Sequence, residues 1–147
     1  MSPMIEHAPL PDVDDTTRPF WDGTAAGELR VQRCGACGRR RVPPRPMCPS
    51  CQSLDAEWEA VSGRGTIWSF IVPHPPLLPA FMPVAPYNVI VVALDEDPTL
   101  RMVGNLLADE GAEINSVDPQ TITIGEPVRV VFQPAGEDIV LPRWVRS

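Results

Sequence analysis

Lysine is absent from the 147-residue sequence, and all 12 basic residues are arginine. This absence excludes a Schiff-base lysine, a P-loop lysine and a lysine general base. Histidine is scarce too, with only His7 and His74. His74 stands in a stiff proline-rich run from which its ring could enter a pocket, but a packed or surface imidazole is the simpler interpretation. Since G-x-S-x-G and H-E-x-x-H motifs are also missing, the sequence does not indicate a self-sufficient enzyme.

Long apolar runs are lacking as well. No stretch approaches the roughly 18 to 20 apolar residues of a membrane span, and residues 1–10 lack the basic start and apolar run of a secretory signal. We therefore expect a soluble, cytoplasmic chain.

The net charge of −7 disfavours a general nucleic-acid binder. The 19 prolines and 10 glycines disfavour long helices and favour short strands joined by turns.

The four cysteines form two close pairs, Cys34/Cys37 and Cys48/Cys51, with the spacing C-x2-C-x10-C-x2-C. Four thiolates in two such turns can converge on one tetrahedral ion. We interpret them as a structural Zn²⁺ site, with rubredoxin-like iron as one alternative and two disulfides, which need an oxidising compartment, as another. The metal would stabilise a segment that has almost no apolar core. It would also leave no cysteine free as a nucleophile.

Local patterns divide the chain into an N-terminal arm with a short helix (1–28), a zinc ribbon (29–56) and a β domain (57–147). We expect the helix to begin after an N-cap at Thr17 and to end at Gly27. A strand over 28–33 leads into the first cysteine pair. Residues 58–61 and 65–72 predict one long strand, bent at a bulge over 62–65. Further strands are expected at 87–94, 100–107, 127–133 and 139–145. Five strands close most economically as an OB-type barrel.

Two segments are candidates for contact with a partner. Residues 73–86 hold six prolines interspersed with apolar side chains, and are too stiff to collapse and too apolar for a plain linker. We expect this loop to dock on a partner or to line its acyl tunnel; the alternative is that it folds over its own barrel. Residues 30–45 carry six arginines and no acid. They would meet CoA phosphates or an acidic partner surface, or equally form a solvated surface that offsets the charge of the metal site.

Motifs spaced over residues 17–145 together resemble one family, first catalogued as domain of unknown function 35. The motifs are Pro19-Phe20-Trp21-Asp22-Gly23, Gly27-Glu28-Leu29, Gln32-Arg33-Cys34, Pro43-Pro44-Arg45, Cys48-Pro49-Ser50-Cys51, Trp58, Ser62-Gly63-Arg64-Gly65-Thr66, Trp68-Ser69-Phe70, Pro86-Tyr87 and Gly125-Glu126-Pro127-Val128. The resemblance implies a mainly β fold with a short N-terminal helix, a rubredoxin-like zinc ribbon and a C-terminal five-stranded OB-fold barrel.

The resemblance also implies a non-catalytic accessory subunit of a thiolase-superfamily enzyme. Such partners include acetoacetyl-CoA thiolases, hydroxymethylglutaryl-CoA synthase assemblies and lipid-transfer-protein-like aldolases that shorten steroid side chains. We expect a hetero-oligomer, for example α2β2, in which the partner binds most of the acyl-CoA. The arginine-rich, lysine-free composition resembles that of high-GC bacteria, in which members of this family that serve steroid breakdown are common. A steroid-derived acyl-CoA is therefore the preferred substrate class.

The candidate residues for partner or acyl-CoA contact come from the arginine patch and the apolar loop. They are Arg39, Arg40, Arg41, Arg45, His74, Leu78, Phe81, Met82 and Tyr87. The sequence leaves three alternatives to this function open. They are an accessory subunit of an acetyl-CoA-type thiolase, a zinc-ribbon/OB protein that binds nucleic acid through stacked aromatic side chains, and a stand-alone hydrolase or isomerase that uses His74.

Overall fold

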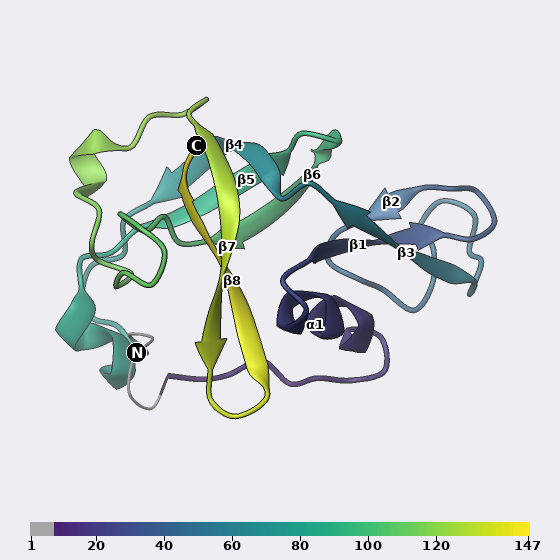
Figure 1. The fold of residues 1–147 in the computed structure, drawn as a ribbon, viewed down its shortest axis with the longest axis horizontal. Coiled ribbons are helices and arrows are strands. Elements are labelled where there is room, and N and C mark those ends of the chain that lie inside the picture. Colours follow the sequence, from purple (N-terminus) through teal and green to yellow (C-terminus); the bar gives the residue numbers. More distant parts are fainter. Residues whose placement is uncertain (1–7) are drawn as a thin grey trace.

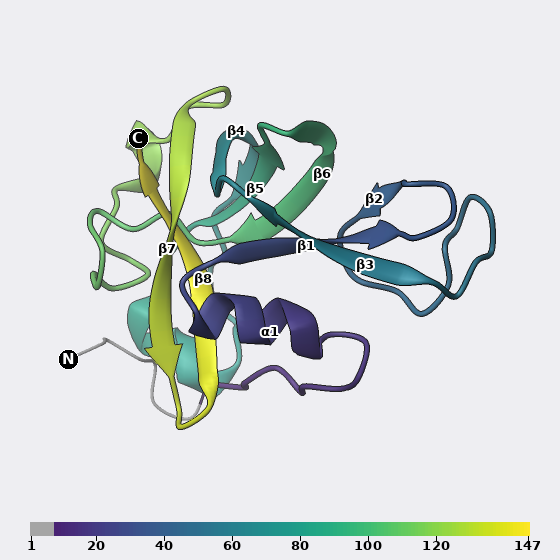
Figure 2. The same ribbon diagram turned by 45° about the vertical axis from the view of Figure 1, so that its right-hand side comes forward.

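A computed structural model describes residues 8–147 of the chain. It places two β-sheets side by side, with the smaller sheet projecting from a barrel and one helix beneath their junction (Figure 1). The view in Figure 2 shows the same projection from another side. His7, together with the rest of residues 1–7, lies outside the described residues. In the described part, no helix is long and apolar enough to cross a membrane.

The predicted short helix is present as α1 (Arg18–Ala25). Thr17 precedes it, and its N–H donates to Asp14 Oδ1 over 2.8 Å while its Oγ1 accepts from the Asp14 N–H over 3.2 Å. This reciprocal pair closes the turn that leads into the helix. Gly27 ends the segment with a φ of +75°, a backbone conformation that favours glycine. The helix packs against β1 of the small sheet and β8 of the barrel.

The small sheet is the ribbon, with the antiparallel order β2-β1-β3. Its strands are β1 (Leu29–Cys34), β2 (Arg40–Arg41) and β3 (Ala56–Val61). Within residues 33–60 the only buried side chains are those of Cys34, Arg41 and Cys48. An apolar core therefore does not hold this part of the ribbon together. By contrast, Leu29 and Val31 on the first half of β1 belong to the core cluster of the barrel.

The second sheet has five strands in the antiparallel order β6-β5-β4-β7-β8. They are β4 (Arg64–Ile71), β5 (Val89–Leu94), β6 (Asp97–Gly104), β7 (Pro127–Ala135) and β8 (Ile139–Arg146). The sheet curls until Leu106, just after β6, forms a parallel bridge to Trp144 on β8. The Leu107 N–H donates to the Trp144 carbonyl over 2.7 Å, and the Trp144 side chain is fully buried. The predicted mainly β fold with a five-stranded OB-type barrel is confirmed.

The long bent strand expected over 58–72 is two strands in different sheets. β3 pairs with β1 in the ribbon, whereas β4 pairs with β5 and β7 in the barrel. The sequence correctly located the break, because Gly63 has a φ of +76° and a Cβ there would lie 2.4 Å from Val130 Cγ1. The bulge expected over 62–65 is a junction between sheets, and the register shift lies instead between Ile67 and Ser69.

The proline-rich segment 73–86 contains a short 3-10 helix, η1 (Pro79–Val84); a second, η2 (Pro119–Thr121), precedes β7. Phe81 and Val84 pack against a small buried cluster around Leu107 and Val131. Leu78 and Met82 remain 59% and 45% exposed. The segment thus folds partly over its own barrel, while two of its large apolar side chains face outward.

We predict that Gly65→Ala destabilises the barrel through a steric clash. Gly65 is buried between β5 and β7, and an added Cβ would lie 2.4 Å from the Ala93 carbonyl oxygen. Overpacking of this kind lowers the free energy of unfolding by about 1–3 kcal/mol, which urea denaturation would measure. The neighbouring exposed Arg64→Ala should change it by less than about 0.5 kcal/mol. Equal effects of the two substitutions would contradict the packing described for β4.

Candidate metal centre and binding groove

The four cysteine sulfurs meet at the outer end of the ribbon, all within 4.8 Å of one another. Cys34 Sγ lies 3.5 Å from Cys51 Sγ, and Cys37 Sγ lies 3.6 Å from Cys48 Sγ. These separations are far from the roughly 2.05 Å of a disulfide bond. They are close to the edge of about 3.8 Å expected when four sulfurs surround a tetrahedral ion at about 2.3 Å. The donor set and its spacing therefore fit one metal ion.

Backbone N–H groups prepare part of this donor set as thiolate. The N–H groups of Cys37 and Ala36 each lie 3.4 Å from Cys34 Sγ and lower the pKa of that thiol to about 6. The N–H groups of Cys51 and Ser50 likewise lower the pKa of Cys48. At Cys51 the Ser53 N–H acts in the same direction, but hydrogen bonds with the other sulfurs and burial outweigh it and raise the pKa to about 11. Metals bind the thiolate form, so this arrangement favours a cation.

The arginines of the ribbon line a hollow of about 260 Å³, yet they are not equivalent. Arg40 forms a two-point ion pair with Glu59, with N···O distances of 2.6 and 3.2 Å. Arg41 is buried; its Nε donates to Gln32 Oε1 over 2.6 Å, and its Nη1 has no partner among residues 8–147. Arg39 donates to Ser50 Oγ and remains exposed, as does Arg45. Of the arginines around this hollow, Arg39 and Arg45 are exposed to solvent; Arg33, elsewhere in the predicted basic patch, is also exposed and lies 3.8 Å from Glu59 Oε1.

An apolar groove of about 250 Å³ lies where α1 meets the ribbon. The aromatic pair Phe20 and Trp21 forms one wall, with ring centroids 4.9 Å apart in an edge-to-face arrangement. Trp58 of β3 and the Pro43-Pro44 turn line the remainder near the ribbon. Such a groove is suited to apolar side chains or a ligand chain, since its lining offers few polar groups.

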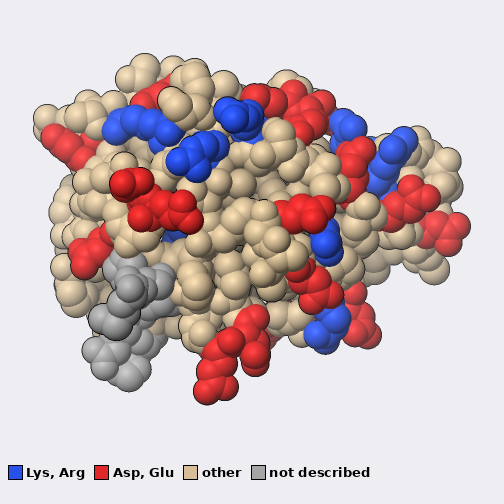
Figure 3. All heavy atoms as spheres, viewed as in Figure 1, with Lys and Arg blue, Asp and Glu red and all other residues tan. Residues whose placement is uncertain are grey.

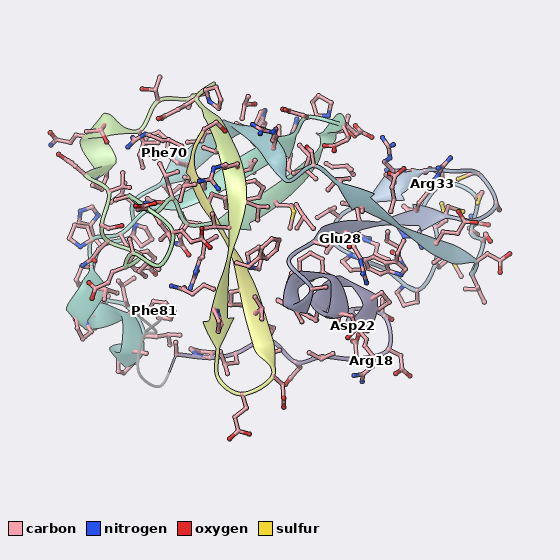
Figure 4. All side chains as sticks on the ribbon, in the orientation of Figure 1. Arg18, Asp22, Glu28, Arg33, Phe70 and Phe81 are labelled. Atoms are coloured by element: carbon pink, nitrogen blue, oxygen red, sulfur yellow. The ribbon has the colours of Figure 1, made fainter. Side chains whose placement is uncertain are left out.

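A second hollow, of about 440 Å³, continues from this groove and shares Phe20, Trp21 and Met102 with it. Phe81 and Tyr87 line it with ring centroids 5.7 Å apart, so the structure brings these two predicted residues together. Figure 4 shows Phe81 near η1, at the end of the molecule opposite Arg33 on the ribbon. We call the two connected hollows the interface groove. It extends from the ribbon toward η1.

The other candidate residues lie apart from the interface groove. Leu78 and Met82 are exposed but line neither hollow of the groove. His74 lines a separate hollow of about 390 Å³ with Val72, Pro86 and residues 118–120, and its Nδ1 lies 2.9 Å from the Val72 carbonyl oxygen. No hydroxyl or thiol side chain lines that hollow, and Asp118 supplies its one carboxylate among the described residues.

Arg143 is a groove residue that sequence reasoning missed. It lines the larger hollow from β8 and shares its strand face with Leu141 and Val145. A charged residue on an otherwise apolar strand face is a detectable signal, because such a position has to find a polar partner. Trp58 and Met102 were missed as groove residues for another reason, since only the packing of ribbon on barrel brings them together.

We predict that Cys48→Ser removes the metal and unfolds the ribbon. A structural ion bound by four thiolates contributes on the order of 10 kcal/mol to such a segment. Elemental analysis should find well below one ion per chain, and the amide protons of residues 29–61 should lose protection in hydrogen exchange. Ser50→Ala is the matched control in the same turn, because its Oγ accepts from Arg39 and ligates nothing. Full metal content in Cys48→Ser would contradict the assignment.

Comparison with known proteins agrees with both parts of the fold. Residues 21–57 match the family described as ChsH2, rubredoxin-like zinc ribbon domain, and residues 58–133 match ChsH2, C-terminal OB-fold domain. The chain is 37% identical over 134 residues to the 3-oxo-4,17-pregnadiene-20-carboxyl-CoA hydratase alpha subunit of Mycobacterium tuberculosis, covering 91% of this chain and 37% of that subunit. It spans less than two fifths of the length of the curated hydratase subunits that it matches.

Two further comparisons cover their relatives more fully. A DUF35 domain-containing scaffold protein of Methanothermobacter thermautotrophicus is 32% identical over 111 residues, which is 75% of each chain. A chain of the solved structure described as Ltp2-ChsH2(DUF35) aldolase superposes with a TM-score of 0.77 at 33% identity, covering 93% of this chain and 98% of that one. The chain thus belongs to the ChsH2 (DUF35) family, in which a rubredoxin-like zinc ribbon is joined to an OB-fold domain.

Proposed function

We propose that this chain is a non-catalytic accessory subunit that binds and stabilises a thiolase-superfamily acyl-CoA enzyme, preferably a lipid-transfer-protein-like retro-aldolase. The observation that carries the proposal is the similarity along 93% of the chain to a chain of the Ltp2-ChsH2(DUF35) aldolase. An exposed apolar groove on a protein of this size is also typical of a surface that meets another protein.

The chemistry of the described residues supports a role without catalysis. The four cysteines are committed to one cluster, and no hydroxyl or thiol side chain of the described residues lines the hollow beside His74. We propose that the ion is Zn²⁺, because four thiolates in a tetrahedral arrangement are a common structural zinc set and the matching family domain is described as a zinc ribbon. Such a closed site has no ligand position open to substrate, so the reacting groups would belong to the partner.

The preferred substrate is a steroid-derived acyl-CoA, bound mainly by the partner. The name of the Mycobacterium tuberculosis relative includes a pregnadiene carboxyl-CoA, and this supports a steroid-derived substrate. On this chain, Arg39 and Arg45 are the exposed guanidinium groups of the ribbon hollow that would face the CoA phosphates. The assembly would be a hetero-oligomer in the cytoplasm, for example α2β2.

Co-expression with a lipid-transfer-protein-like thiolase homologue from the same organism tests this proposal. We expect the two chains to co-purify, the partner to be poorly soluble alone, and retro-aldol cleavage of a steroid acyl-CoA to require both chains. The isolated chain should turn over no thioester, because it lacks reactive groups. A partner that is soluble and fully active alone, or turnover by the isolated chain, would contradict the accessory role.

A second candidate is a subunit that serves hydration of an enoyl-CoA. The observation in its favour is the 37% identity to a hydratase alpha subunit, of which this chain matches 37% of the length. The same co-expression experiment separates the two candidates when the product is analysed. Water addition to an unsaturated acyl-CoA without carbon–carbon cleavage would favour the hydratase, and release of a shortened acyl product would favour the aldolase.

We predict that the chain does not bind single-stranded DNA. Basic groups on the face seen in Figure 3 are scattered among acidic ones, and the net charge is −7. Trp68, which is 50% exposed on β4, is already covered by Arg101, whose guanidinium lies 3.7 Å from the ring centroid. A fluorescence titration at low salt should detect no complex. Binding that weakens steeply as salt is raised would instead indicate a phosphate-contacting protein.

A further inference from the structure

Arg143 has no acidic partner among the residues that the structure describes. Its Nε donates to Gln133 Oε1 over 2.9 Å, and its Nη1 donates to Asn105 Oδ1. Both acceptors are neutral amides, and none of the ion pairs formed within residues 8–147 includes Arg143. Burial lowers the pKa of Arg143. A partly desolvated cation with only neutral acceptors is less stable than one paired with a carboxylate.

The groups around Arg143 add donors rather than acceptors. Gln133 is buried, and its Nε2 has no hydrogen-bond partner among the described residues. Asn105 uses its Nδ2 to donate to the Asn88 carbonyl over 2.6 Å. Arg143 Nη2 likewise has no protein acceptor within residues 8–147. This cluster therefore lacks one negatively charged acceptor.

The hollow above this cluster is otherwise apolar. Arg143 is the one charged residue that lines it, and Phe81, Tyr87 and Leu141 are among its walls. Val103, on the rim, is 69% exposed. The single guanidinium in this hollow matches a single carboxylate, while Arg30 and Arg41 line the other hollow of the groove, near the ribbon. The continuation of the hollow past Phe20 and Trp21 to the ribbon gives the occupant an elongated path.

We propose that the interface groove binds an extended segment of the partner subunit, in which one Asp or Glu carboxylate pairs with Arg143 and neighbouring apolar side chains fill the groove. The inference rests on the proposed function, which supplies the partner. Charge complementarity to Arg143 and the elongated apolar path favour a polypeptide as the occupant. Pairing would satisfy the Arg143 guanidinium only when the complex forms, so it would favour the bound state.

Arg143→Met in the co-expressed complex tests the carboxylate contact. Methionine keeps much of the apolar stem and removes the charge. Loss of one member of a buried, hydrogen-bonded charge pair should weaken the complex by roughly 30-fold or more, mainly through faster dissociation. Arg129→Met is the matched control, because Arg129 is exposed on the adjacent strand β7 and lines neither hollow of the groove. Its affinity should stay within about twofold of the unsubstituted complex.

Photo-crosslinking keeps the inference testable even if Arg143→Met disturbs folding. A benzophenone side chain at Val103 should cross-link to a partner peptide that contains an Asp or Glu, as mass spectrometry would identify. The same group at Ile124, which is 61% exposed and lines none of the hollows described above, should give no such product. Replacing the identified carboxylate with its amide should weaken the complex as much as Arg143→Met does, and the two changes together should add little.

The outcomes separate this inference from the proposed function. A complex that forms with unchanged affinity in Arg143→Met, or that cross-links at residue 124 and not at 103, overturns the inference and leaves the accessory role intact. Cross-linking at residue 103 to acyl-CoA or to a second copy of this chain also overturns it. If the unsubstituted chain binds no thiolase-like partner, the proposed function fails and the inference fails with it.

Discussion

The four cysteine sulfurs that meet at the outer end of the ribbon determine how this part of the chain is held together. Residues 33–60 bury only three side chains, and two of these belong to Cys34 and Cys48. We therefore propose that metal coordination takes the place of an apolar core in the ribbon. Because Leu29 and Val31 at the start of β1 lie in the barrel core, order at the metal site is connected to the wall of the interface groove. The same coordination leaves the chain without a free thiol.

The barrel positions the other half of the groove. Trp144 on β8 points inward and closes the sheet through its bridge to Leu106, while the neighbouring Arg143 lines the hollow outside. Alternation along one strand thus couples barrel closure to the presentation of a cation. Phe20 and Trp21 on α1 connect this hollow to the ribbon. The resulting surface belongs to no single element, which suits the docking role proposed for this chain.

Local signals made much of this fold predictable. The cysteine spacing, the start of the helix at Thr17 and the break at Gly63 each follow from neighbouring residues. The contacts between distant segments could not be predicted from such local signals. Alternation of apolar and polar residues indicates that residues 56–61 form a strand, but it does not predict that this strand pairs with β1. Nothing near Arg40 in the sequence predicts its ion pair with Glu59. The groove was unpredictable for the same reason, because it forms only where helix, ribbon and barrel meet.

A count of reactive thiols tests whether one metal ion holds all four cysteines. A chromogenic disulfide reagent, applied to the metal-loaded native chain, reports every cysteine that is not held by the ion. The account predicts almost no fast reaction in the native protein, and four reacting thiols together with one released metal ion after denaturation with a chelator. Rapid reaction of all four cysteines in the native chain, with no metal released, would contradict it.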